Sequence, residues 1–219
     1  MIISQTPFRV SFFGGGTDYP SWLSQNEGLI LSTTINKYCY ITVRELPPFF
    51  DYNYRIRYYI KEETKTINQI KHPVIKNLFK IYKLNKNIDL VHHSDLPAMS
   101  GLGSSSSFSV GLINCLNHFT KQKQSKLDIA FNAINLEQNI LKENVGCQDQ
   151  LAAAYGGLNL YKLKKKSNHS VIPINLKSSD KQKLENSCFL IFTGFTRNAS
   201  KIAKDQISRI NMNNNYLNS

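Results

Sequence analysis

Residues 94–116, with the sequence SDLPAMSGLGSSSSFSVGLINCL, place two glycines and four consecutive serines directly before an apolar run. The run has the spacing of one helical face, which relates Phe108, Leu112, Cys115, Leu116 and Phe119. The first backbone N–H groups of a helix lack an internal partner, and the helix dipole adds partial positive charge there. Gly101 and Gly103 would let a ligand approach the main chain closely. The sequence therefore favours an anion, such as the phosphates of a nucleotide, at the start of this helix.

The loop differs from two well-known phosphate-binding sequences. It lacks the Gly-Lys-Ser/Thr of a P-loop. As a dinucleotide-binding sequence, G-L-G-S-S-S has serine in place of the third glycine, and Lys121 stands near the position, about 20 residues further on, where an acid is expected. On the glycines and serines alone, Ser104 acting only as the N-cap of the helix is an equal alternative. Other parts of the chain have to decide between a ligand site and a simple cap.

Two acids lie further along, in NLEQNILKENVGCQDQLAAAYGG, residues 135–157. Phosphoryl transfer needs a divalent metal near the phosphates and usually a carboxylate that orients or deprotonates the attacking hydroxyl. Glu137, in an otherwise apolar helical segment, and Asp149, after the break at Gly146, are candidates for these two roles. The plainer alternative is that both are solvated surface acids.

The segment TPFRVSFFGGGTDYP, residues 6–20, carries a third candidate group. Arg9 would project from a strand, where a guanidinium can stabilise an anionic transition state or keep a nearby carboxylate deprotonated. Asp18 follows three glycines and is placed to accept hydrogen bonds from sugar hydroxyls. A turn or salt-bridge role is the alternative for each residue, although a hairpin turn needs only one or two glycines.

The net charge of +12 raises the question of a nucleic acid or an acidic membrane as partner. The lysines are scattered along the chain and form no single basic stripe, which favours a solvated surface and neither of those partners. Cysteines 39, 115, 147 and 188 show no spacing typical of a metal site or a disulfide framework. The sequence shows no signal peptide and no membrane span, so we expect a cytoplasmic protein.

Hydrophobic patterning predicts a strand-rich beginning, a helical middle and further strands towards the end. The expected strands are residues 1–13, 28–46, 52–60, 88–94, 156–163 and 188–192. The expected helices are residues 72–84, 108–119, 127–141 and 198–210. This mixture places the chain in the α+β class.

Taken in order, P-F-R-V-x-F-F-G-G-G-T-D, P-x-x-x-G-L-G-S-S-S and G-C-Q-D-Q-x-A-A-A-Y-G-G resemble motifs of the GHMP kinases, the family of galactokinase, homoserine kinase and mevalonate kinase. The resemblance runs from about Pro7 to about Ile210. It implies an α+β fold of the ribosomal protein S5 domain 2-like type, with the ATP-binding N-terminal domain over residues 1–180. Residues 181–219 would begin a C-terminal domain that is largely missing. Because that domain carries a further glycine-rich motif in the family, the activity of this chain alone is an open question.

The resemblance also implies roles for individual residues, with ATP and Mg²⁺ as cofactors. Asp149 would be the catalytic base, with Arg9 beside the reacting hydroxyl. The ATP phosphates would be held by Pro97, Ser100, Gly101, Leu102, Gly103, Ser104, Ser105 and Ser106. The metal would be held by Ser104, Ser105 and Glu137. The substrate would be held by Gly15, Gly16, Thr17, Asp18 and, for a distal phosphate, Arg197.

Within the family, FGGGTDYP is similar to the turn of the kinases that act on heptose 7-phosphate. The implied reaction is phosphorylation of the anomeric hydroxyl of D-glycero-D-manno-heptose 7-phosphate to the 1,7-bisphosphate, for nucleotide-activated heptose and surface polysaccharide. The implied partner is a small sugar phosphate, with no nucleic acid or membrane. The open alternatives are a kinase for another sugar, such as fucose or galactose, and a truncated, inactive nucleotide-binding remnant.

Overall fold

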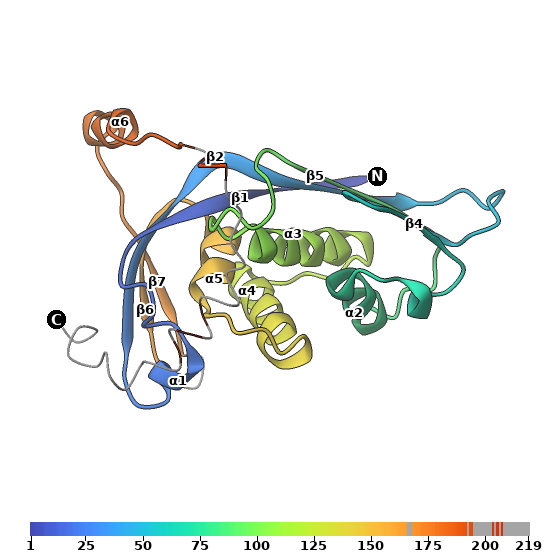
Figure 1. Cartoon of the computed structure of the whole chain (residues 1–219), viewed down its shortest axis with the longest axis horizontal. Helices are drawn as coiled ribbons and strands as arrows, with labels where there is room; N and C mark the ends of the chain where they lie inside the picture. The colour runs from blue at the N-terminus through green and yellow to red at the C-terminus, as the bar shows by residue number, and fades with distance from the viewer. Residues whose placement is uncertain (166–167, 192, 195–202, 204, 206, 208–219) are drawn as a thin grey trace.

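The sheet that organises the chain has seven strands, and its longest strand, β2, pairs with three others (Figure 1). In this computed structural model the described residues are 1–165, 168–191, 193–194, 203, 205 and 207. The strands are β1 (Ile2–Phe13), β2 (Gly28–Glu45), β3 (Tyr54–Arg57), β4 (Lys61–Thr64), β5 (Ile88–Ser94), β6 (Leu158–Leu163) and β7 (Ser170–Pro173). The helices are α1 (Pro20–Leu23), a 3-10 turn (Ile67–Gln69), α2 (Pro73–Ile81), α3 (Ser104–Phe119), α4 (Lys126–Asn135), a π-helical turn (Leu136–Ile140), α5 (Gln148–Tyr155) and α6 (Ser178–Asn186).

The strands lie in the order β4-β3-β5-β2-β6-β7, and β1 pairs with β2 as well. All of these pairs are antiparallel except β3 with β5. The C-terminal half of β2 pairs with β5, and its N-terminal half pairs with β6. One strand therefore joins the two ends of the sheet.

Helices α2, α3, α4 and α5 cover one face of the sheet (Figure 1). Because side chains alternate between the faces of a strand, the apolar residues of β2 at Cys39, Ile41 and Val43 all point towards these helices and are buried. Helix α3 packs its apolar side chains directly against β1 and β2. This layer is the main core, and a second buried cluster surrounds Trp22.

Most of the expected elements are confirmed, some with different bounds. The strand expected at 88–94 has those bounds, whereas the one expected at 52–60 is shorter and is followed by β4. The helix expected at 127–141 continues through a π-helical turn. None of the described helices is both long and apolar enough to cross a membrane.

The strand expected at 188–192 is wrong in its described part, Cys188–Ile191, which has no regular structure. The apolar run is there, but Phe189 and Ile191 are 85% and 79% exposed, and none of the described strands pairs with it. A strand needs a partner for its backbone groups, which local composition does not provide. Phe192 and most of the helix expected at 198–210 lie outside the described residues.

Gly111 tests the packing of α3 on the sheet. A Cβ at this position would lie 2.6 Å from Thr6 Oγ1 and 3.1 Å from Ser4 Oγ, on β1. We expect Gly111→Val to lower the free energy of unfolding by roughly 2 kcal/mol or more, because an overpacked core displaces its neighbours. Chemical denaturation measures the change. His118→Val, at an exposed position of the same helix, controls for the low helix propensity of valine. Equal losses in the two variants would contradict this account of Gly111.

Candidate active site

Three successive residues at the start of α5 connect three separate segments of the chain. The backbone N–H of Gln148 donates to Asp18 Oδ2 at 3.2 Å. Next to it, Asp149 accepts from Arg9, and Gln150 Nε2 then donates to Glu137 Oε2 at 2.6 Å. The first turn of α5 therefore brings together the three acids that the sequence singled out.

Arg9 and Asp149 form the central contact of this group. Nε and Nη2 of Arg9 each lie 2.7 Å from Asp149 Oδ1. Arg9 also holds the glycine-rich loop, because its Nη1 donates to Gly101 O at 3.1 Å and its backbone N–H donates to Leu102 O at 3.1 Å. The guanidinium thereby links β1, the loop before α3 and the start of α5.

The glycine-rich loop needs its glycines for conformation and for space. Gly101 and Gly103 have φ of 77° and 76°, in the region that favours glycine. A Cβ on Gly103 would lie 3.3 Å from Asp149 Oδ2 and 3.3 Å from Arg9 Cγ. Gly103 is also the N-cap of α3, with no side-chain cap, and Ser104 is the first helical residue. The interpretation of Ser104 as the N-cap is therefore wrong.

The four serines of the loop face different surroundings. Ser104 is half-buried and Ser105 is exposed, whereas Ser106 and Ser107 are buried. The hydroxyl of Ser106 donates to Glu137 Oε2 at 2.9 Å, and that of Ser107 donates to Pro7 O at 2.9 Å. Of the four serines at the start of α3, Ser106 is therefore the one that donates a hydrogen bond to buried Glu137.

Glu137 has no exposed surface. Burial raises the pKa of its carboxyl to about 7, although the nearby polar side chains of Ser109, Gln150 and Ser106 act in the opposite direction. Its Oε1 has no hydrogen bond of acceptable geometry among the described residues. A buried carboxylate oxygen without a partner is costly, and a cation would relieve the cost. No group of three or more His, Cys, Asp or Glu side chains in the described part of the chain could hold a metal by itself.

Asp18 is the second buried acid, and it is 2% exposed. Burial raises the pKa of its carboxyl to about 6, and the negative charge of Asp149 adds to the rise. A Cβ on Gly146 would lie 1.7 Å from Asp18 Oδ2, so only glycine fits there. The preceding turn is closed by Thr17, whose N–H and hydroxyl both donate to Gly14 O, at 3.1 and 2.8 Å.

Among the candidate residues, hydrogen bonds join Arg9 with Asp149, Gly101 and Leu102, and Ser106 with Glu137. Gly15 is exposed and Gly16 half-buried, in the turn that leads to buried Thr17 and Asp18. Pro97 is exposed and Ser100 half-buried, in the loop that leads to Gly101. Arg197 lies outside the described residues.

Sequence reasoning missed Gln148 and Gln150, and it interpreted Gly146 only as a break before Asp149. Gln150 holds Glu137 in place, and Gly146 makes room for Asp18. The signal was present in G-C-Q-D-Q, where two amides flank the acid and a glycine precedes them. An amide buried beside an acid has to find a partner, and here the acid of another segment provides it.

The comparison with protein families agrees with this geometry. Residues 68–157 match the model described as the GHMP kinases N terminal domain. The chain is 29% identical to a D-glycero-alpha-D-manno-heptose 7-phosphate kinase of Campylobacter jejuni, over 95% of this chain and 64% of that protein. It is 33% identical to a galactokinase of Clostridium perfringens over 44% of this chain and 25% of that protein. The chain thus spans less than two thirds of the length of these relatives.

Solved structures show the same architecture. A D-glycero-D-manno-heptose 1-phosphate kinase of Bacteroides thetaiotaomicron superposes with a TM-score of 0.79 at 25% identity, over 99% of this chain and 73% of that one. A galactokinase of Lactococcus lactis, complexed with galactose, superposes with a TM-score of 0.62 at 17% identity, over 80% and 47% of the two chains. Over residues 68–157 the chain is therefore similar to the N-terminal domain of the GHMP kinases, and its fold is similar to that of the solved heptose 1-phosphate kinase. Over nearly its whole length it resembles a heptose 7-phosphate kinase.

Asp18 makes the stability of the protein depend on pH. Because its folded-state pKa of about 6 lies above the usual value of 3.8 for an aspartate, the folded protein keeps a proton that the unfolded chain has released. The free energy of unfolding should therefore fall as pH rises through this window. We expect Asp18→Asn to remove this contribution and to be more stable than the parent above pH 6, by on the order of 2–3 kcal/mol.

Chemical denaturation between pH 4 and pH 8 measures this difference. The two proteins should converge towards pH 4, where Asp18 is protonated in the folded state. Asp180→Asn, on the exposed helix α6, is the matched control. A parallel pH dependence in the parent and in Asp18→Asn would refute the role of this carboxyl.

Proposed function

We propose that this chain is the nucleotide-binding part of an ATP-dependent sugar kinase that uses Asp149 as its catalytic base. The single observation that carries the proposal is the contact of Asp149 with Arg9 directly beside Gly103, at the start of α3. A base, a cation and a glycine-rich helix start are the parts that phosphoryl transfer to a hydroxyl requires. The similarity to two kinds of sugar kinase supports the acceptor class.

The geometry of Asp149 suits a base that receives a proton from a sugar hydroxyl. Both Arg9 nitrogens contact Oδ1. Oδ2, the oxygen beside Gly103, accepts none of the hydrogen bonds of the described residues and remains for the substrate. Arg9 fixes the orientation of the carboxylate through these two contacts. Its remaining donors would also stabilise negative charge that develops at the transferred group.

The phosphates of ATP would lie against the loop from Pro97 to Ser106, where small side chains leave the backbone N–H groups of α3 accessible. Glu137 fits the role of a metal ligand because its Oε1 is buried without a good hydrogen bond. Ser104 and Ser105 are the hydroxyls assigned to the metal, and Ser106 joins them through its contact with Glu137. Mg²⁺ is commonly held by one or two carboxylates together with substrate phosphates, so a single glutamate is compatible with it. When bound, MgATP supplies the transferable phosphoryl group with its charge neutralised.

The acceptor would lie against the turn of Gly15, Gly16, Thr17 and Asp18, with Asp18 receiving sugar hydroxyls. We assign D-glycero-D-manno-heptose 7-phosphate as the substrate and the 1,7-bisphosphate as the product, a precursor of nucleotide-activated heptose. The similarity to a heptose 7-phosphate kinase over 95% of this chain supports this assignment. Arg197 is proposed for the distal phosphate. Residues 1–180 would be the N-terminal domain and residues 181–219 the beginning of the next.

Two alternatives have specific support. The similarity to galactokinases over 44% of the chain favours an unphosphorylated hexose as acceptor. The second alternative is a chain that binds nucleotide without turnover, for which the glycine-rich loop before α3 would be sufficient. Both alternatives differ from the main proposal in the ADP that the purified chain is expected to release from ATP with each sugar.

ADP release from the purified chain with MgATP and a panel of sugars and sugar phosphates tests the proposal. We expect release to be fastest with heptose 7-phosphate. Asp149→Asn should lower kcat by at least 10²-fold with a small effect on nucleotide binding, because general-base contributions are typically 10²–10⁴-fold. Asp180→Asn removes an acid on exposed α6 and should leave kcat unchanged.

The other outcomes separate the alternatives. A preference for galactose or fucose over heptose 7-phosphate would contradict the substrate assignment. It would not contradict the role of Asp149 as the catalytic base. ATP binding without any turnover would support the nucleotide-binding remnant. Equal activity of Asp149→Asn and the parent protein would refute the role of Asp149.

A further inference from the structure

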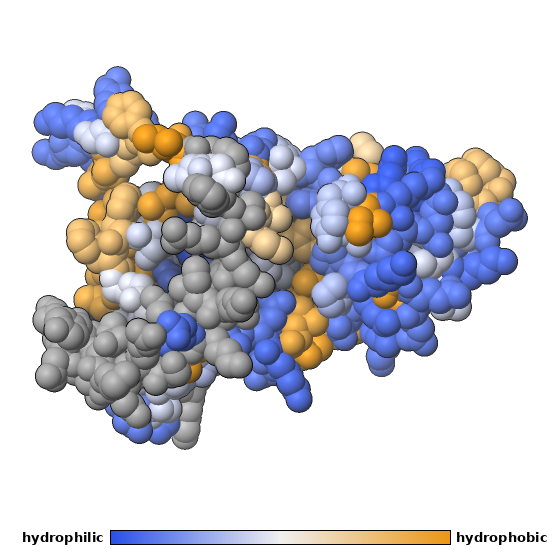
Figure 2. All heavy atoms as spheres, in the orientation of Figure 1, coloured by the Kyte–Doolittle hydropathy of each residue, from blue (hydrophilic) through white to orange (hydrophobic). Residues whose placement is uncertain are grey.

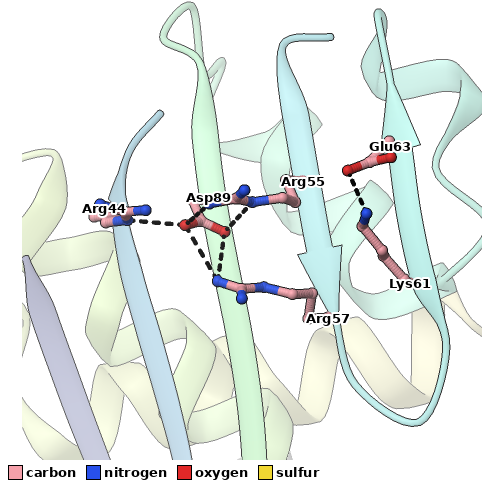
Figure 3. Close-up of polar contacts among 6 residues, drawn as sticks. All are labelled: Arg44, Arg55, Arg57, Lys61, Glu63 and Asp89. Atoms are coloured by element: carbon pink, nitrogen blue, oxygen red, sulfur yellow. Dashed lines mark hydrogen bonds and ion pairs between the residues drawn. The ribbon is translucent and has the colours of Figure 1, made fainter. Parts of the chain in front are cut away.

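Three arginines surround one buried acid on the opposite face of the sheet from the helices (Figure 3). Asp89 lies on β5, between Arg44 of β2 on one side and Arg55 and Arg57 of β3 on the other. Their neighbours along these strands, such as Val43, Ile56 and Leu90, point into the core. None of the contacts described above for the candidate active site involves these four residues.

Asp89 is fully engaged by the three guanidinium groups. Arg55 donates through Nε and Nη2 at 3.1 and 2.7 Å, Arg44 through Nε at 2.8 Å, and Arg57 through Nη2 at 3.1 and 3.3 Å. Burial by itself would raise the pKa of Asp89, but these hydrogen bonds and charges lower it to about 2. The side chain of Asp89 is 1% exposed although the sheet face around it is open. The cluster therefore holds one negative and three positive charges at neutral pH.

The three arginines have more N–H donors than the carboxylate of Asp89 has acceptor positions. A guanidinium has five N–H groups, and a carboxylate has about four acceptor positions. Arg55 is held on two sides, because it chelates Asp89 and lies over the Phe50 ring at 5.1 Å. In contrast, both Nη atoms of Arg44 make no hydrogen bond within the described residues, and Arg57 Nε is buried without a partner. Arg44 and Arg57 each keep 43% of the side chain exposed.

Arg44 and Arg57 border a hollow of about 310 Å³. The hollow is lined by Met1, Thr42, Arg44, Arg57, Asp89, Val91 and His93. We propose that it is a binding site for a small phosphate-bearing anion, held between the guanidinium groups of Arg44 and Arg57. The volume is at the lower end of the range for small-molecule sites, roughly 300–1,000 Å³. The planar fork of arginine matches the oxygens of a phosphate group.

Asp89 acts as the positioning residue of this site. It fixes two long side chains whose freedom would otherwise oppose binding, and it leaves the cluster with two excess positive charges. An extended nucleic acid fits this face less well, because Glu63 on β4 and Asp89 on β5 interrupt the positive charge (Figure 3). Base stacking also needs aromatic platforms, and the hollow has no Phe, Tyr or Trp in its lining.

The test is a titration of the full chain with inorganic pyrophosphate, followed by NMR of the arginine Nε–Hε groups. The chain has six arginines, so this spectral region is sparse. We expect saturable shifts of Arg44 and Arg57, with an affinity at least ten-fold weaker in the Arg44→Gln/Arg57→Gln variant. Lys61→Gln removes a positive charge from the same face, where Lys61 pairs with Glu63, and should bind as the parent does.

The Arg44→Lys/Arg57→Lys variant keeps both positive charges but loses the planar guanidinium groups. In this variant Arg55 still binds Asp89. The lysine variant should also bind more weakly, and it serves if the glutamine variant does not fold. The same titration separates this site from the glycine-rich loop, because a ligand bound only at that loop would shift Arg9 alone. That result would overturn the proposal. Equal weakening by Lys61→Gln, or binding of citrate or a single-stranded oligonucleotide but not pyrophosphate, would overturn it too.

Discussion

The ion pair between Arg9 and Asp149 is the contact on which the rest of the site depends. It crosses from the first strand of the sheet to a helix near the end of the domain, and the same guanidinium holds the loop before α3. Once Asp149 is fixed, its neighbours Gln148 and Gln150 stand opposite Asp18 and Glu137. A single helical turn thereby orders three acids that lie far apart in the sequence.

Two buried acids in this arrangement lower the stability of the folded protein. Asp18 and Glu137 both have a raised pKa because they are buried, and each has one oxygen without a good hydrogen bond among the described residues. Such groups are retained in proteins chiefly where a ligand, a metal or a reaction uses them. In Figure 2, hydrophilic residues cover most of the surface at the end of the molecule that carries α2 and β4. The two buried acids therefore depart from the usual placement of charged groups at the surface.

The sequence was sufficient for the strands β1, β2 and β5 and for helix α3, because their hydrophobic periodicity is long and regular. Motif order was sufficient to select Arg9, Glu137 and Asp149 as candidates. It could not pair Gln150 with Glu137, since that contact depends on the rotation of one helical turn against another. It also gave no hint of the Asp89 cluster, because the register between β3 and β5 places Arg55 opposite Asp89 only after the sheet has formed. The strand expected at 188–192 failed for the related reason that pairing is decided by distant segments.

The pairing of β2 has a consequence for how the chain reaches its folded state. Gly28, near the start of the chain, lies opposite Leu163 of β6. The edge of β2 that pairs with β6 therefore stays unpaired during synthesis until β6, far along the chain, has emerged from the ribosome. Contacts of such long sequence separation form slowly, and unpaired strand edges are open to association in the meantime. Asp18 is joined to Gln148 at the start of α5 across a similarly long separation, so the proposed active site should be among the last parts of the molecule to form.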